Sequence, residues 1–151
     1  PPKGWMGAGA YENSWTPDLL KEAGYIYSMD WPCDDQPIWM RTRSGPILLV
    51  PYPVELNDSP QVIHRQHTGR EFCDMLVDQF EEMIEQSAKH PLVCNISIHP
   101  FVFGQPFRLR PLRNALKHCF SNKFMDRVWK CKPADIADYC YTLKSGIIPG
   151  S

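Results

Sequence analysis

The chain has 151 residues, of which 43% are hydrophobic, enough to form a globular core. Its formal net charge of −1 creates no overall field for nucleic acid or anionic lipid, so we expect neither nucleic acid nor membrane as a partner. No apolar run approaches the roughly 20 residues of a membrane span, and the first residues lack a secretory signal, so we expect a cytoplasmic protein.

Four helices are predicted from capping signals and apolar spacing, within 16–24, 68–91, 109–120 and 132–146. Thr16 is expected to cap the first helix, because Pro17 follows it at the first helical position. Thr68 and Glu71 form a capping box before the long second helix. The apolar face of the last helix is expected to contain Ile136, Tyr139 and Leu143.

Four strands are predicted between these helices, at 25–30, 46–52, 93–99 and 127–131. Their continuous apolar runs indicate strands that are buried on both faces. Strands that alternate with helices favour parallel βαβ units and hence an α/β fold. The stretches 31–45 and 53–67 are expected to be loops.

The six cysteines are expected to be reduced thiols rather than a disulfide framework. Cys73 and Cys119 fall on apolar helix faces, Cys94 falls in a predicted strand, and no C-x-x-C pair occurs. His64 and His67 have no third ligand nearby, so no metal site is expected from this chain.

Polar residues follow the predicted strands at their carboxyl ends, where parallel α/β folds bind ligands. The first strand leads into Asp30, Trp31, Asp34 and Asp35, the second into Glu55, Asn57 and Asp58, and the third ends in His99. Together, carboxylates and an imidazole on one edge of the sheet suit general acid–base chemistry. Individually, the acids could cap turns or be solvated, and the histidine could be a hydrogen-bonded core residue.

The loop after His99 indicates that this imidazole is held in place. Pro100 disfavours helical geometry at His99, and Gly104 and Pro106 set the turn before the next helix. Arg108, Arg110 and Arg113 lie around that helix start, where they could hold an anion or form a solvated face.

The motifs PKGW…GAG…E…TPDLLKEAGY…DWPCDDQP, PYPVELND and SIHPFVFGQPFRLRPLRNAL resemble the polysaccharide deacetylase superfamily, which has the NodB-homology fold. Within it, they resemble the branch of allantoinase-like carbon–nitrogen hydrolases. The resemblance implies that residues 1–151 are a single domain, the C-terminal half of a distorted (β/α) barrel whose N-terminal half is absent from this chain. It also implies hydrolysis of non-peptide carbon–nitrogen bonds in an N-acetyl sugar, an amide or a cyclic ureide such as allantoin.

The same resemblance implies roles for individual residues. His99 matches the late histidine of the family, which protonates the leaving group or stabilises the intermediate. Asp30 and Trp31 match an Asp-Trp motif whose carboxylate supports the site and whose indole forms a pocket wall. Further positions typical of this branch, expected to contact substrate, are Glu12, Asp34, Asp35, Glu55 and Asn57.

The family's metal-binding motifs lie in the half that this chain lacks. The resemblance therefore implies no cofactor held by this chain, while the complete enzyme could use a divalent metal of the zinc type. Because a few parallel strands leave open sheet edges, we expect a partner, either the N-terminal half of the barrel or a second copy of the chain. The alternative is a non-catalytic fragment, or a binding or assembly module that keeps the fold.

Overall fold

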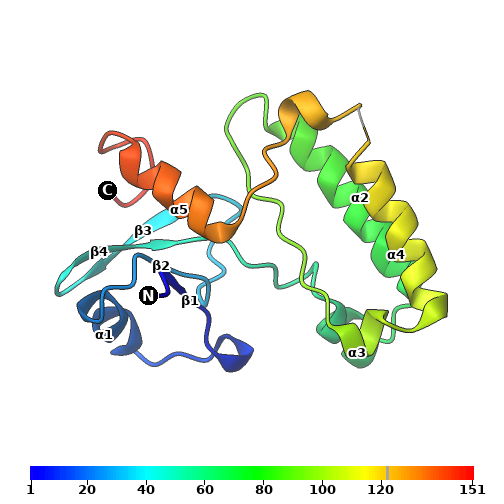
Figure 1. Cartoon of the computed structure of the whole chain (residues 1–151), viewed down its shortest axis with the longest axis horizontal. Coiled ribbons are helices and arrows are strands. Elements are labelled where there is room, and N and C mark those ends of the chain that lie inside the picture. Colours follow the sequence, from blue (N-terminus) through cyan, green and yellow to red (C-terminus); the bar gives the residue numbers. More distant parts are fainter. Residues whose placement is uncertain (122) are drawn as a thin grey trace. The chain divides into compact units, whose positions relative to one another are not determined.

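A computed structural model describes residues 1–121 and 123–151 (Figure 1). The chain divides into two compact units. We call Pro1–Tyr52 with Lys130–Ser151 the sheet unit, and Pro53–Trp129 the helical unit. Each unit has its own hydrophobic core.

The sheet unit contains an open four-stranded sheet in the order β1-β2-β4-β3. Its strands are β1 (Gly4–Trp5), β2 (Tyr27–Ser28), β3 (Ile38–Thr42) and β4 (Gly45–Leu49). The β1–β2 and β2–β4 pairs are parallel, whereas β3 pairs antiparallel with β4. The predicted α/β class is therefore confirmed, with a mostly parallel open sheet.

Strand β4 is covered on both faces, as its continuous apolar run predicts. Leu48 and the following Val50 pack on Ala137 and Cys140 of helix α5 (Pro133–Thr142). Side chains alternate along a strand, so Ile47 and Leu49 face the other side, and both are buried there as well. Helix α1 (Thr16–Glu22) contacts β3 and β4.

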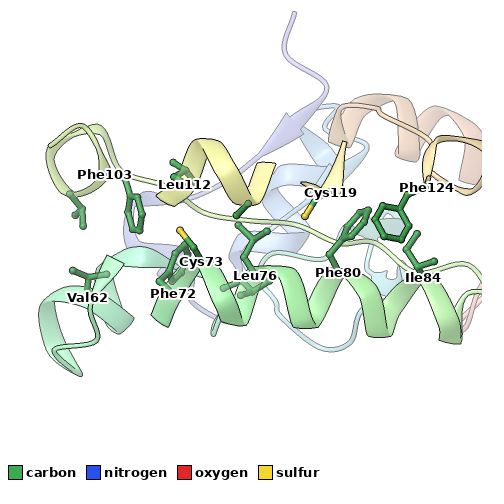
Figure 2. Close-up of a cluster of buried hydrophobic side chains, with 13 residues drawn as sticks. Val62, Phe72, Cys73, Leu76, Phe80, Ile84, Phe103, Leu112, Cys119 and Phe124 are labelled. Carbon is green, nitrogen blue, oxygen red and sulfur yellow. The ribbon is translucent and has the colours of Figure 1, made fainter. Parts of the chain in front are cut away.

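The helical unit is built on two long helices, α2 (Gly69–Gln86) and α4 (Pro106–Cys119), which pack against each other (Figure 1). Figure 2 shows Phe72, Leu76 and Phe80 of α2 among the buried side chains of this core. The short helix α3 (Pro100–Phe103) adds Phe103, whose ring centroid lies 5.1 Å from that of Phe72. A π-helical turn spans Ser59–His64, and 3-10 turns span Ala8–Ala10 and Met125–Arg127.

The helix predictions differ from the structure mainly at their caps and faces. The capping box of Thr68 and Glu71 is confirmed. Thr16 does not cap α1; instead, the side-chain oxygen of Asn13 accepts hydrogen bonds from the N–H groups of Trp15 and Thr16 at 3.0 and 3.1 Å, because asparagine readily forms such turns. Tyr139 is 56% exposed, since the face of α5 that packs on the sheet is formed by Ile136, Ala137 and Cys140.

Three strand predictions are wrong. The stretch 31–45 is not only loop, because β3 forms a hairpin with β4, and Gly45 provides a φ of +100° beside the turn. The segment 93–99 is half-buried and forms a single parallel bridge, Ser97 with Asn57, because only its alternate residues pack on the helical core. No strand forms over 127–131, where a 3-10 turn leads into irregular backbone.

Candidate active site

Asp30 lies just beyond the carboxyl end of β2, and Gly7 lies just beyond the carboxyl end of the neighbouring parallel strand β1. Both carboxylate oxygens of Asp30 accept a hydrogen bond from the backbone N–H of Gly7, at 2.8 and 2.9 Å, and Asp30 is 6% exposed. A Cβ atom at position 7 would lie 3.1 Å from one of these oxygens, which explains why glycine stands there. Asp30 therefore joins the ends of two strands.

Glu12 is the second carboxylate of a cluster in the sheet unit. We call Glu12, Ser28, Asp30 and Trp31 the sheet-unit cluster. Its two oxygens accept hydrogen bonds from the indole N–H of Trp31 and, at 3.2 Å, from the hydroxyl of Ser28. Burial raises the pKa of Glu12 and the nearby Asp30 carboxyl adds to the rise, while the hydrogen bonds from Trp31 and Ser28 partly oppose it. Glu12, Ser28, Asp30 and Trp31 thus form one network that includes a carboxyl with a raised pKa.

Asp34 and Asp35 follow this network in the loop that leads to β3. Both residues are exposed, and the backbone N–H of Asp35 donates to the Asp34 carboxylate at 2.7 Å. Partial burial raises the pKa of Asp35, and the Asp34 charge adds to the effect. Asp34 therefore stabilises a local turn. This structural role is the alternative to the predicted substrate contact of Asp34 and Asp35.

His99 of the helical unit is paired with a buried carboxylate. The Oδ1 atom of Asp58 lies 2.6 Å from Nδ1 of His99, and Oδ2 accepts the backbone N–H of His99 at 2.7 Å. Asp58 is fully buried, whereas 37% of the His99 side chain is exposed. The carboxylate favours a proton on Nδ1, so the Nε2 atom can accept or deliver a proton at the surface.

Local sequence explains how this pair is built. His99 precedes α3 with φ −102° and ψ 127°, so the expectation that Pro100 keeps it in extended geometry is confirmed. The backbone N–H of Asp58 donates to the carbonyl of Ser97 at 3.1 Å, and that of Ser97 donates to the carbonyl of Leu56 at 2.9 Å. These bonds hold the segments around Asp58 and Ser97 side by side and direct the carboxylate toward the imidazole.

Two other predicted residues of the helical unit lie on the same segment. The side-chain oxygen of Asn57 accepts the N–H of Ser59 at 3.2 Å, which gives it a local structural role. Glu55 is exposed, and its backbone carbonyl accepts a hydrogen bond from the side chain of Gln61 at 3.0 Å. Only Asn57 is therefore brought close to the Asp58–His99 pair, as the residue before Asp58.

Asp58 is the functional residue that the sequence does not identify on its own. Its position among the polar residues after the second predicted strand does not reveal that it is the partner of His99. The signal is the alternation in VELND: Leu56 and Asp58 are buried, whereas Glu55 is exposed. An acid that shares the buried side of a segment with a leucine requires a hydrogen-bonding partner.

The predicted residues thus form two groups, each within one unit. Glu12, Asp30 and Trp31 are connected in the sheet unit, and Asn57, Asp58 and His99 lie together in the helical unit. The expectation that both groups share one edge of a sheet stays a prediction.

The described part of the chain contains no cluster of side chains suited to a metal ion. Over residues 1–121 and 123–151, no three His, Cys, Asp or Glu side chains are grouped so that they could hold an ion. All six cysteines are free thiols, as expected, and Cys73, Cys119 and Cys140 are buried. Within the same described ranges, no helix is both long and apolar enough to span a membrane.

Comparisons with known proteins were made for both sequence and structure. No protein-family model and no curated protein matches the sequence. Among solved structures, PuuE allantoinase is similar with a TM-score of 0.82 and 26% identity, over 97% of this chain and 47% of that chain. A probable polysaccharide deacetylase from Pseudomonas aeruginosa PAO1 has a TM-score of 0.80 and 26% identity, over 97% of this chain and 48% of that chain.

A third structure agrees with these two. A structure from Mycobacterium smegmatis, named after polysaccharide deacetylases, is 22% identical with a TM-score of 0.72, over 95% of this chain and 51% of that chain, and it supports the fold alone. The chain spans about half the length of the solved structures it matches. It is therefore structurally related to allantoinase and polysaccharide deacetylases and has the fold of about half of a NodB-type protein.

Proposed function

We propose that this chain is the C-terminal half of a NodB-type catalytic barrel that hydrolyses non-peptide carbon–nitrogen bonds. The support is the similarity to structures named allantoinase and polysaccharide deacetylase, at 26% identity over nearly the whole chain. Allantoin is a cyclic ureide and an N-acetylated sugar carries an amide, so the proposed substrates share a carbonyl carbon bonded to nitrogen.

The observation that carries the proposal is the Asp58–His99 pair. Cleavage of a carbon–nitrogen bond requires a proton for the departing nitrogen, and an imidazole can supply it near neutral pH. Asp58 holds Nδ1 at 2.6 Å, while among the described residues Nε2 has no hydrogen-bond partner. His99 is therefore the proposed general acid, and Asp58 is its positioning residue.

The sheet unit has its own group of residues that we propose to be functional. We assign Asp30 a positioning role for Glu12 and Trp31, because its buried carboxylate accepts the backbone N–H of Gly7 through both oxygens and interacts with the Glu12 carboxyl. Glu12 and Trp31 are the proposed substrate contacts of this network. Four further residues are weaker proposals for substrate contact, because each is exposed or is hydrogen-bonded within its own turn: Asp34, Asp35, Glu55 and Asn57.

A divalent metal does not fit the described residues of this chain. Asp58 and His99 are only two potential ligands, and they are hydrogen-bonded to each other. We assign no reaction step to a metal; in the complete enzyme its ligands would come from the other half. The proposed partner is that N-terminal half or a second copy of the chain, and the six free thiols fit a reducing compartment such as the cytoplasm.

The test is activity of the native assembly. Intact-mass spectrometry of the purified sample first identifies every polypeptide present, and the assembly is then assayed with allantoin and with N-acetylated oligosaccharides. His99→Ala should reduce turnover by about 10²–10⁴, because general acid catalysis is lost. His90→Ala, which alters an exposed histidine of the same unit, is the matched control and should retain activity.

Two results would refute the hydrolase. Unchanged turnover in His99→Ala would remove His99 from the mechanism. A native sample with an intact fold and no activity on either substrate class would favour the non-catalytic binding or assembly module.

A further inference from the structure

The helical unit has a cavity of about 430 Å³ that is open to solvent at the surface, where the N-terminal end of α2 meets the start of α4. This volume is in the range of small-molecule sites. Its lining includes His67 and Arg70 from the α2 side and Phe107 and Arg108 from α4. Neither Asp58 nor His99 lines it, so the cavity is distinct from the proposed catalytic pair.

The polar side chains of the cavity are mainly cationic. Arg70 and Arg108 carry two positive charges, and His67 adds a third when protonated. Glu71, the residue after Arg70, accepts hydrogen bonds from the backbone N–H and the hydroxyl of Thr68 at 2.7 and 2.8 Å. Its single negative charge offsets one of the two arginine charges, so the arginines still leave the lining net positive.

Arg108 is held in place before any ligand binds. Its Nη1 atom donates to the carbonyl of Val102 at 3.2 Å, and its guanidinium carbon lies 4.8 Å from the ring centroid of Phe107. Its aliphatic stem lies across the first residue of α2, where a Cβ atom at Gly69 would approach Arg108 Cγ to 2.9 Å. Glycine at position 69 thus allows the stem of Arg108 to lie against this turn.

The remaining walls provide an apolar surface. Phe107 is 70% exposed although it lies beside an arginine, and Val62 and Pro111 line the same cavity. An aromatic ring on a ligand could stack on Phe107, while its charged group reaches the guanidinium groups.

We infer that this cavity binds a small organic oxyanion, a carboxylate or phosphate attached to an apolar body. Planar guanidinium groups pair with both anions through two parallel hydrogen bonds, and a cationic ligand would be repelled. The inference does not depend on the proposed hydrolase activity. The sequence alone allows two interpretations of Arg108, as an anion-binding residue or as part of a solvated face. The inference favours the first.

The test is titration of the ¹⁵N-labelled chain with phenyl phosphate and with benzoate, followed by amide chemical shifts. Benzyl alcohol, which keeps the ring without the charge, is the control ligand. We expect saturable shifts at Gly69, Arg70 and Arg108 with a Kd of about 1 mM for the better anion, and none for benzyl alcohol. The tighter of the two anions identifies the charged group.

Variants separate this site from general charge attraction. Arg70→Gln and Arg108→Gln should each weaken binding about tenfold, because each removes a charge-assisted contact. Arg113→Gln alters an exposed arginine of α4 outside the cavity and should leave the Kd unchanged. Arg70 is exposed, so its variant tests the site even if Arg108→Gln unfolds. Absence of saturable binding, or equal loss in Arg113→Gln, would overturn the inference.

Discussion

Replacement of Asp58 tests whether the buried carboxylate organises His99. In Asp58→Ala, the backbone N–H and Nδ1 of His99 lose acceptors that lie 2.7 and 2.6 Å away. A hydrogen bond to a charged group contributes about 1.5–3 kcal/mol. The hydrogen-bond energy of the backbone N–H is lost in full. Nδ1 belongs to a side chain that is 37% exposed, so it can regain part of its hydrogen-bond energy from water. We therefore expect the free energy of unfolding to fall by about 2–4 kcal/mol.

The assay combines urea unfolding, followed by circular dichroism, with ¹⁵N NMR of the His99 ring. In the unmodified chain, the neutral ring should carry its proton on Nδ1. In Asp58→Asn, the side-chain amide oxygen should accept the backbone N–H of His99. The amide N–H then faces Nδ1, which must act as the acceptor, so the proton of the neutral ring should move to Nε2. Asp78→Ala, at an exposed position of α2, is the control and should change stability by less than about 0.5 kcal/mol. Equal stability of Asp58→Ala and Asp78→Ala, or an unchanged tautomer in Asp58→Asn, would refute the reasoning.

Three further predictions concern other parts of the chain. In a carbon-detected NMR titration, Glu12 should show a raised pKa that Asp30→Asn lowers; because the folded pKa is raised, the stability due to Glu12 is complete at acid pH and is lost as pH rises through that pKa. Phe72→Ala should lower the free energy of unfolding in urea by about 3–5 kcal/mol, since Phe72 is fully buried, and a loss well below about 1 kcal/mol would contradict the packing described. Alkylation followed by mass spectrometry should modify exposed Cys33 long before Cys73, because burial raises the pKa of the Cys73 thiol to about 11; equal rates would contradict this burial.

Asp30 and Asp58 illustrate how similar environments support different roles. Both carboxylates are buried and both accept a backbone N–H, from Gly7 and from His99 respectively. Only Asp58 also faces a titratable ring, at 2.6 Å. This second contact is why the proton transfer is assigned to the helical unit, and why Asp30 is assigned a positioning role.

Local signals were sufficient to predict α1, α2, α4 and α5, but not the short helix α3 or the π-helical turn Ser59–His64 in the stretch expected to be a loop. The Thr68–Glu71 capping box and the apolar spacing after it predict α2 because both partners lie within one turn of the chain. The covered strand β4 was likewise predicted, since a continuous apolar run indicates burial on both faces. The fold class follows from the alternation of these elements.

Strand pairing was predicted less well because it depends on partners that are distant in the sequence. The segment 93–99 has strand-like composition, yet within its unit it forms one bridge, with Asn57. Strand β3 was missed because its neighbours, such as Pro37 and Asp35, suggest a loop, and its pairing with β4 supplies the hydrogen bonds that local sequence does not reveal.

The sequence by itself determined which chemical groups were available: an imidazole before Pro100, acids after the apolar runs, and helices with defined starts. Only the tertiary structure decided which of these groups meet. It pairs Asp58 with His99 across 41 positions and Asp30 with Gly7 across 23. Such pairs depend on the packing of whole segments, because burial of a carboxylate is favourable only where a distant donor is brought within hydrogen-bonding distance.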